Sequence, residues 1–220
     1  MKLTIVYDNE IFKKDLDLRS DWGFACLIKT SDEYILFDSG AKGNILLNNM
    51  KMLDIEPRDI SKIIISHEHW DHNGGLKSII PFVNNAELYS LEKNEYGKKI
   101  KPINVESPQM ITKDIHTTGR LTGSPIDEQS LIIKGKKGWY ILVGCSHPGV
   151  DKILQAAQKI GNAVGIIGGF HGFRDFSILE DLNFVCPCHC TKYKKEIKKG
   201  LSTIFSDCGV GKIIDLNEEE

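Results

Sequence analysis

The stretch ISHEHWDHNGG, residues 65–75, places three histidines and two acidic side chains within six consecutive positions. His67 and His69 are two residues apart, so in an extended segment their side chains project to the same side. Asp71 and His72 follow where the two glycines indicate a turn, and they provide a second pair of ligand-type side chains. Neutral imidazole and carboxylate bind zinc, and also iron or manganese. The segment therefore predicts a site for two adjacent metal ions; an exposed polar turn is the alternative interpretation.

Further histidines stand in three later motifs, GCSHPG at residues 144–149, GGFHG at residues 168–172 and CHCT at residues 188–191. In the first of these motifs, either Cys145, as a thiolate, or His147 could bind metal. A buried, inert cysteine is the alternative for Cys145. We favour His147 as the ligand because an imidazole reaches farther than a thiol.

Two more histidines and a cysteine-rich run need separate interpretations. His171 follows a glycine pair that would let the backbone approach a ligand closely. Substrate contact, proton donation, metal binding and a purely structural role are all open for it. His116 belongs to no motif, and we interpret it as structural or as lying at the edge of a substrate site. The run CPCHC at residues 186–190 has C-x-C rather than C-x-x-C spacing, which disfavours a closed structural zinc site.

Asp38, in LFDSG, ends a predicted strand in the same way as the histidine-rich segment does. We expect its carboxylate to accept a hydrogen bond from a ligand imidazole and so to fix the imidazole tautomer. An Asx turn that caps the next loop is the alternative. Glu68 and Trp70 are expected to point away from His67 and His69, with Glu68 solvated and Trp70 packed.

Short β-rich segments and helices must position these side chains. The first half of the sequence predicts strands at residues 2–8, 23–30, 33–40 and 61–67 and helices at residues 44–53 and 72–83. The second half predicts a hairpin from residues 129–136 and 138–145, strands at 163–169 and 183–189, and helices at 150–160, 176–182 and 191–202. The segments EYILFDSG and GWYILVGCS have the same shape, which suggests two similar halves. Two sheets face to face, with helices outside, would bury both apolar strand faces.

Composition excludes several classes of protein. The 220 residues, with 41% hydrophobic and 26% charged side chains, suit one globular domain over residues 1–220. A net charge of −2 argues against nucleic-acid binding. The chain opens like a strand, without a signal peptide, and no apolar stretch approaches the ~20 residues that span a bilayer. We therefore expect no membrane association and a cytoplasmic location, with the six cysteines reduced. The oligomeric state is left open.

The motif His67-x-His69-x-Asp71-His72, after an III strand and before NGGL, resembles the signature of the metallo-β-lactamase superfamily. LFDSG at residues 36–40 is similar to the strand and turn that precede the first helix of that superfamily. DEQSL, GCSHPG, GGFHG and CHCT together resemble the branch that includes 7,8-dihydropterin-6-methyl-4-(β-D-ribofuranosyl)-aminobenzene-5′-phosphate synthase and related metal-dependent hydrolases. The resemblance extends from about residue 3 to residue 205. It implies an α/β fold, a four-layer αββα sandwich with a dinuclear metal site.

The resemblance also implies roles for individual residues. It gives the first ion the ligands His67, His69 and His147, and the second ion the ligands Asp71, His72 and His189. The aspartate that usually bridges the ions is replaced by Gly144-Cys145-Ser146, so Cys145 or water alone would bridge them. Asp71 and His171 are the residues we expect to take part in catalysis. The cofactor is two divalent ions, zinc first, with iron or manganese as alternatives, and the partner is a small-molecule substrate.

Three functions are compatible with these residues. Two divalent ions ~3.5–4 Å apart can share a water molecule, lower its pKa from ~15.7 towards ~7, and stabilise charge on a carbonyl or phosphoryl oxygen. The first hypothesis is therefore a metal-dependent hydrolase of a small ester, lactone, thioester or phosphoester. The branch implies the second, a synthase that joins a dihydropterin to ribofuranosylaminobenzene 5′-phosphate. A non-catalytic metal-binding or redox-sensing protein is the third.

Overall fold

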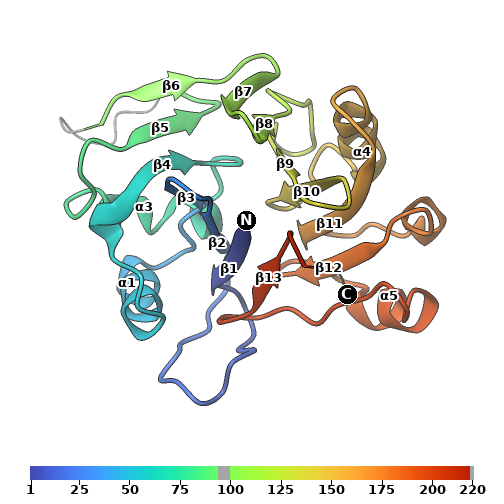
Figure 1. The fold of residues 1–220 in the computed structure, drawn as a ribbon, viewed down its shortest axis with the longest axis horizontal. Helices are drawn as coiled ribbons and strands as arrows, with labels where there is room; N and C mark the ends of the chain where they lie inside the picture. Colours follow the sequence, from blue (N-terminus) through green and yellow to red (C-terminus); the bar gives the residue numbers. More distant parts are fainter. Residues whose placement is uncertain (94–99, 219–220) are drawn as a thin grey trace. The chain divides into compact units, whose positions relative to one another are not determined.

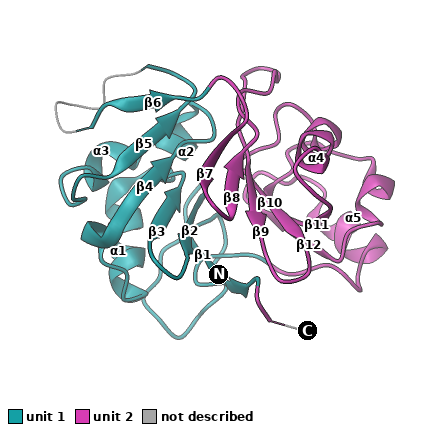
Figure 2. Cartoon of the chain, turned by 45° about the horizontal axis from the view of Figure 1, so that its top comes forward, with its two compact units in different colours: residues 1–105, 208–216 teal, residues 106–207, 217–220 magenta. Residues whose placement is uncertain are grey.

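A computed structural model describes residues 1–93 and 100–218, which group into two compact units, coloured separately in Figure 2. Unit 1 consists of residues 1–105 and 208–216, and unit 2 of residues 106–207 together with the chain end from residue 217. Within the described ranges, each unit contains one sheet, of seven strands in unit 1 and of six in unit 2 (Figure 1).

The sheet of unit 1 has the strand order β13-β1-β2-β3-β4-β5-β6. Its strands are β1 (Lys2–Tyr7), β2 (Ala25–Lys29), β3 (Tyr34–Phe37), β4 (Ile60–Ile64), β5 (Glu87–Ser90), β6 (Pro102–Asn104) and β13 (Ile213–Asp215). β13 pairs antiparallel with β1, so the last strand of the chain lies beside the first. β3, β4, β5 and β6 run parallel to one another. Their carboxyl ends therefore meet at one edge of the sheet, where β3 leads into Asp38 and β4 into Ser66.

Helices cover one face of this sheet. They are α1 (Gly43–Met52), the 3₁₀ helix η1 (Pro57–Asp59), α2 (Trp70–Asn73) and α3 (Leu76–Ile79). Leu46 and Met50 of α1 and Leu76 of α3 are fully buried in one apolar cluster with Leu27 and Leu36 of the sheet. Burial of each such side chain contributes about 1.5–3 kcal/mol. This packing fixes α1 and α3 against the strands that carry the histidine-rich segment.

The prediction of one helix over residues 72–83 was wrong, because the chain forms two short helices, α2 and α3, around Gly74 and Gly75. A Cβ at position 74 would come within 2.4 Å of the carbonyl oxygens of Ala41 and Trp70, and one at position 75 within 2.2 Å of the Ser39 carbonyl oxygen. The two glycines therefore allow the neighbouring backbone to approach closely, and the helix is interrupted where this contact occurs.

The sheet of unit 2 has the strand order β12-β11-β10-β9-β8-β7. Its strands are β7 (Gln109–Thr112), β8 (Ile115–Thr117), β9 (Leu131–Lys134), β10 (Trp139–Val143), β11 (Ala163–Gly169) and β12 (Phe184–Cys188). β9 and β10 form the predicted hairpin, with Trp139 opposite Lys134. β10, β11 and β12 are parallel, so the three later histidine motifs follow neighbouring strands at one sheet edge.

The helices of unit 2 are α4 (Val150–Gln158), the 3₁₀ helix η2 (Phe176–Leu179) and α5 (Lys194–Gly200). Ile153 and Ala157 of α4 and Ile197 of α5 are fully buried in an apolar cluster that includes Ile141 and Ile166 of the sheet. The helix predicted at residues 176–182 is a 3₁₀ turn, and the one predicted at 191–202 is confined to α5. No helix among the described residues is long and apolar enough to cross a membrane.

Candidate metal centre

Asp38 and Ser66 lie side by side because β3 and β4 are parallel neighbours, with Phe37 opposite Ile64. Asp38 Oδ1 accepts the Ser66 backbone N–H at 2.7 Å, and Asp38 Oδ2 accepts the Ser66 hydroxyl at 2.7 Å. Both residues are fully buried. The carboxylate of Asp38 thus ties the end of one strand to the start of the histidine-rich segment.

The same carboxylate orients the imidazole of His72. Asp38 Oδ2 lies 2.7 Å from His72 Nδ1, and both side chains are fully buried. An ionised carboxylate can only accept, so the Nδ1 atom must carry the proton. His72 then presents Nε2, with its lone pair, as the metal-binding atom. The role expected for Asp38, to accept a hydrogen bond from a candidate ligand imidazole, is confirmed at the level of this contact.

Ser66 connects Asp38 to His67 and so determines which nitrogen of His67 carries the proton. Its hydroxyl proton is donated to Asp38, and its oxygen lies 2.9 Å from His67 Nδ1. Because the hydroxyl has one proton, its oxygen must accept from His67 Nδ1–H. His67 Nε2 is therefore left with a lone pair. One buried aspartate sets the tautomers of His67 and His72, directly for one and through a serine for the other.

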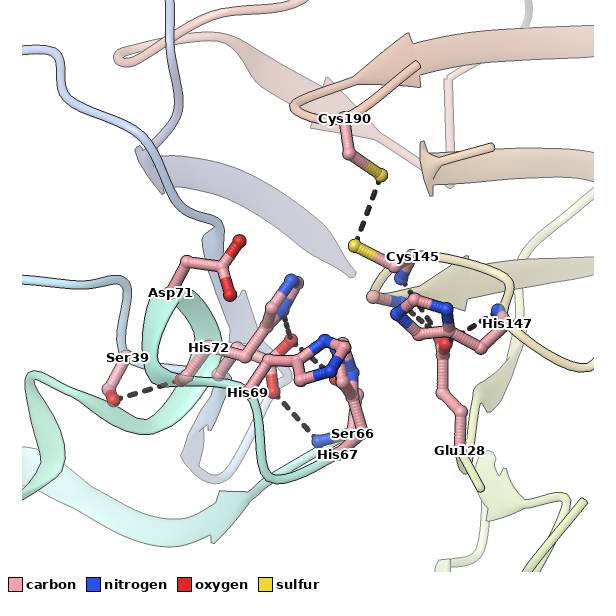
Figure 3. A network of polar contacts seen from close by, with 12 residues as sticks. Ser39, Ser66, His67, His69, Asp71, His72, Glu128, Cys145, His147 and Cys190 are labelled. Carbon is pink, nitrogen blue, oxygen red and sulfur yellow. Dashed lines mark hydrogen bonds and ion pairs between the residues drawn. The ribbon is translucent and has the colours of Figure 1, made fainter. Parts of the chain in front are cut away.

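The imidazoles of His67, His69 and His72 gather in one place (Figure 3). The rings of His67 and His69 have centroids 4.7 Å apart and are nearly perpendicular, at 79°. His67 Nε2 and His69 Nδ1 are 3.1 Å apart. Two nitrogens bound at ~2.0–2.1 Å to one tetrahedral zinc would lie ~3.3–3.4 Å apart. The donor atoms and their separation fit one edge of a zinc coordination sphere.

Asp71 lies in the first turn of α2, and its position is fixed by contacts with the loop that precedes β2. Its Oδ2 accepts the Trp22 indole N–H at 2.8 Å, and its backbone carbonyl accepts the Phe24 N–H at 3.1 Å. The side chain is buried, whereas Trp22 is 49% exposed. The indole N–H thus fixes the orientation of the Asp71 carboxylate.

Glu68 and Trp70 do not have the surroundings that we expected, a solvated Glu68 and a packed Trp70. Glu68 accepts hydrogen bonds from the Ser90 hydroxyl at 2.8 Å and from the Asn73 amide at 2.7 Å, so it links β5 to α2. Trp70 is 62% exposed and does not pack into the core. Sequence alternation placed Trp70 on the side opposite the histidines but could not show what covers that side.

In unit 2, the predicted residues lie just past the ends of β10, β11 and β12. Ser146, His171 and His189 all have positive φ, of 60°, 45° and 43°. Such a conformation costs a non-glycine residue roughly 1–3 kcal/mol and persists only where the surrounding structure enforces it. In unit 1, Asp38 has the same kind of backbone, with φ of 58°. Strained backbone thus coincides with the strand ends that carry candidate ligands.

Glu128 is a residue of this site that the sequence did not reveal. It is fully buried, and its carboxylate accepts four backbone N–H groups (Figure 3). Oε1 accepts those of Gly144, Cys145 and Ser146, at 2.9, 3.0 and 3.1 Å, and Oε2 accepts that of His147 at 2.9 Å. A carboxylate is needed here because four donors converge on two oxygens. The acidic residue inside DEQSL, just before an apolar strand, was the available signal.

A cleft of about 250 Å³ opens beside this loop. His147 and His171 line it, their rings 5.1 Å apart between centroids, together with Ser124, Phe170 and Phe173. Imidazoles beside aromatic rings suit a small organic molecule with a polar group. His171 therefore lines a cavity, and its role, by substrate contact, proton donation, metal binding or structure alone, stays a prediction.

Cys145, His189 and Cys190 form a further group in unit 2, with one ligand atom of each within 4.8 Å of the others. The Sγ atoms of Cys145 and Cys190 are 3.0 Å apart. His116, by contrast, lies in β8, where its ring contacts Trp139 at 5.5 Å between centroids. Among the described residues it belongs to no group of candidate metal ligands, and its role, structural or at the edge of a substrate site, stays a prediction.

The predicted site residues thus fall into two sets, each assembled within one unit. Unit 1 contains His67, His69, Asp71 and His72 with Asp38; unit 2 contains Cys145, His147, His171 and His189 with Glu128. Two statements stay predictions. One is that ligands of both sets bind the same ions, and the other is that His147 rather than Cys145 is the ligand.

The family of the chain is shown by a match to the family model described as metallo-beta-lactamase superfamily, over residues 23–155. This span is more than half of the 220 residues and contains the histidine-rich segment and the loop that Glu128 binds. The chain belongs to the metallo-β-lactamase superfamily. The resemblance inferred from its motifs is confirmed.

Two curated relatives come from Methanocaldococcus jannaschii. The uncharacterized protein MJ0448 is 27% identical over 263 residues, which cover 97% of this chain and 100% of the relative. The 7,8-dihydropterin-6-methyl-4-(beta-D-ribofuranosyl)-aminobenzene-5′-phosphate synthase is 28% identical over 245 residues, which cover 82% of this chain and 83% of the relative. The second likeness agrees with the branch that the sequence motifs resemble.

Solved structures show the same fold. Tm1679, a metal-dependent hydrolase of the beta-lactamase superfamily, matches with a TM-score of 0.82 at 22% identity, over 99% of this chain and 100% of that one. YhfI from Bacillus subtilis, a metallo-beta-lactamase fold protein, matches with a TM-score of 0.71 at 14% identity, over 97% and 98%. The predicted α/β metallo-β-lactamase fold is confirmed.

Proposed function

We propose that the chain is a metal-dependent hydrolase that acts on a small ester, lactone, thioester or phosphoester. The cofactor of this proposal is two divalent ions, zinc first, with iron or manganese as alternatives. The ligands are His67, His69, Asp71 and His72 from unit 1 and His147 and His189 from unit 2, with Cys145 as the alternative to His147. We also propose a cytoplasmic location, in keeping with six cysteines that form no disulfide bond among the described residues.

The observation that carries the proposal is the set of close contacts that the buried Asp38 carboxylate makes. Its contacts at 2.7 Å with His72 Nδ1 and with the Ser66 hydroxyl leave the Nε2 atoms of His67 and His72 unprotonated. Each imidazole therefore has one nitrogen held by a hydrogen bond and a second nitrogen with a lone pair that can bind a cation. Partners of this kind are what orient metal-binding imidazoles and raise their basicity. The donor set, three imidazoles and a carboxylate within unit 1, suits zinc.

Bound divalent ions would supply Lewis acidity towards a carbonyl or phosphoryl oxygen and a lowered pKa for water. Substrate binding and proton transfer would be the task of side chains. The cleft beside His147 and His171 would hold the substrate, with Phe173 against its apolar part. His171 would hold or donate a proton at the leaving group. Asp71, held by the Trp22 indole at 2.8 Å, would keep a fixed carboxylate oxygen towards the reacting atoms.

The test combines metal analysis with a substrate panel. Purified protein would be assayed by inductively coupled plasma mass spectrometry for bound zinc, iron and manganese. It would then be assayed against aryl esters, lactones, a thioester and phosphodiesters. We expect close to two ions per chain and turnover of one substrate class. His69→Ala should lose metal and turnover together, whereas the matched control His116→Ala should keep both. Metal retained in His69→Ala would overturn the site.

A second candidate function rests on the likeness to the dihydropterin synthase, which covers 82% of this chain. In this reading the chain joins a dihydropterin to ribofuranosylaminobenzene 5′-phosphate, and the ions bind phosphate oxygens. Incubation with the two partners, followed by mass spectrometry of the products, separates the candidates. Product from the pair and none from the hydrolase panel would select the synthase. Two bound ions without turnover in either assay would select a non-catalytic metal-binding protein.

A further inference from the structure

Two cysteines far apart in the sequence meet above the middle strand of three. β10, β11 and β12 are parallel neighbours, with Val143 opposite Gly168 and Gly169 opposite Cys188. Cys145 follows the end of β10 by two residues, and Cys190 follows the end of β12 by two residues. β11 lies between these strands. The side chains of Cys145 and Cys190 can therefore meet only over the end of β11.

Gly169, at that end of β11, leaves the space for this contact. A Cβ at position 169 would lie 2.6 Å from Cys190 Sγ and 2.5 Å from the Gly144 carbonyl oxygen. With no side chain there, the Sγ atoms of Cys145 and Cys190 approach to 3.0 Å (Figure 3). A disulfide bond is ~2.05 Å long, so a movement of about 1 Å would bring the sulfurs to bonding distance.

The two thiols differ in access to solvent. Cys145 is 3% exposed, whereas Cys190 is only partly buried. An oxidant from solution would reach Cys190 first, and Cys145 is placed to attack the oxidised sulfur from within. Redox-sensing cysteines are accessible to solvent and often lie next to a second, resolving cysteine.

We propose that Cys145 and Cys190 are a peroxide-sensitive pair whose reversible disulfide controls metal binding. In the first step, Cys190 sulfur takes one oxygen atom from hydrogen peroxide to become a sulfenic acid, and one water molecule leaves. In the second step, Cys145 sulfur attacks Cys190 sulfur, and the sulfenic oxygen leaves as a second water molecule. The two thiols lose two electrons and two protons, and peroxide is the oxidant that is reduced. A dithiol reductant restores both thiols.

Control of metal binding follows from the neighbours of the two cysteines, and this part rests on the proposed function. Cys145 lies in the loop of residues 144–147, whose backbone N–H groups are held by Glu128. Cys190 follows His189 directly. Formation of the disulfide would pull the two strand ends together and so displace the imidazoles of His147 and His189. Because metal affinity depends on ligand placement, the oxidised chain should hold its ions more weakly.

The experiment treats the reduced, zinc-loaded full chain with hydrogen peroxide and divides the sample. One part is alkylated, digested and mapped for cross-linked peptides by mass spectrometry; the other is desalted and assayed for zinc. We expect a cross-link between Cys145 and Cys190, loss of at least half of the zinc, and recovery of zinc binding after dithiothreitol and resupply. Cys190→Ser and Cys190→Ala should lose the cross-link. Cys208→Ser, a buried cysteine outside the pair, should keep it.

The outcomes separate this inference from the proposed function. A cross-link that maps to Cys186 or Cys188 instead, or no cross-link in the wild-type chain, would overturn the redox pair. The mapped cross-link without loss of zinc would overturn its control of metal binding. If the reduced chain never holds zinc, iron or manganese, the proposed function fails and so does control of metal. The peptide map would still decide whether the two thiols form the pair.

Discussion

The carboxylate of Glu128 accepts the backbone N–H of His147 at 2.9 Å, and its other oxygen accepts the N–H groups of the three preceding residues. A loop with a positive-φ serine is thereby held in one conformation by a single buried side chain. His147 owes its direction to this contact and not to its own packing alone. Whichever of Cys145 and His147 binds metal, the loop that positions both depends on Glu128.

Substitution Glu128→Gln should therefore impair the loop without changing side-chain size. The amide replaces one acceptor oxygen with a donor, so at least one of the four N–H groups faces another N–H. Leaving a buried donor without an acceptor costs about 1–3 kcal/mol. We expect a loss of stability in that range, measured by urea unfolding, and a zinc affinity lowered ~10–100-fold. Asp127→Asn, at a more exposed neighbour, is the control and should change zinc affinity little. Equal zinc affinity in Glu128→Gln and wild type would contradict the positioning role.

Substitution Asp38→Asn tests how the tautomers of His67 and His72 are set. In the wild type, the two carboxylate oxygens of Asp38 accept from three donors at 2.7 Å, the Ser66 N–H, the Ser66 hydroxyl and His72 Nδ1–H. An asparagine has a single acceptor oxygen, so at least one of these donors would lose its acceptor. We expect zinc affinity, measured by competition with a chromophoric chelator, to fall ~10–100-fold. Ser66→Ala removes the hydroxyl that joins Asp38 to His67 but keeps the contact of Asp38 with His72, so it should have the smaller effect. If Asp38→Asn lowers the melting temperature of the metal-free chain but leaves zinc affinity unchanged, Asp38 has only a structural role.

Trp22 should report metal binding at Asp71 by fluorescence. Its indole N–H donates to Asp71 Oδ2 at 2.8 Å, and its ring is 49% exposed. A cation at Asp71 draws electron density from that oxygen and weakens the hydrogen bond, so zinc titration should shift the emission. Trp22→Phe should abolish the change, whereas Trp70→Phe, which removes a more exposed ring, should retain it. An emission change in Trp22→Phe as large as in the wild type would show that Trp22 is not the reporter of metal binding.

Sequence reasoning succeeded where chemistry is local and failed where it depends on distant backbone. The spacing of His67 and His69 sufficed to put them on one side of an extended segment, and their nitrogens are 3.1 Å apart. Glu128 was missed because its partners are backbone N–H groups 16–19 residues later, which leave no mark on side-chain type. The contact of Cys145 with Cys190 was missed because the two are 45 residues apart and meet only through the order of three strands.

Alkaline pH should reduce stability through two buried phenols. Burial, and secondarily the nearby Asp21 charge, raises the pKa of Tyr7 to about 12; burial, and secondarily the hydrogen bond to Glu87, raises the pKa of Tyr89 to about 12. An unfolded tyrosine titrates near ~10. Between about pH 10 and 12 the unfolded chain therefore binds fewer protons than the folded chain, and the free energy of unfolding falls as pH rises.

The stabilisation from these two phenols is complete below pH ~10 and is lost as the pH rises towards 12, by up to ~2 kcal/mol for each. Urea unfolding at intervals from pH 9 to pH 12 measures this loss as a slope. In Tyr7→Phe and Tyr89→Phe the slope should be shallower, because phenylalanine has no proton to release, and the double substitution should flatten it further. Tyr34→Phe removes a phenol near the surface of the same sheet and serves as the control. A slope in the double variant as steep as in the wild type would mean that other groups, such as lysines, cause the alkaline loss.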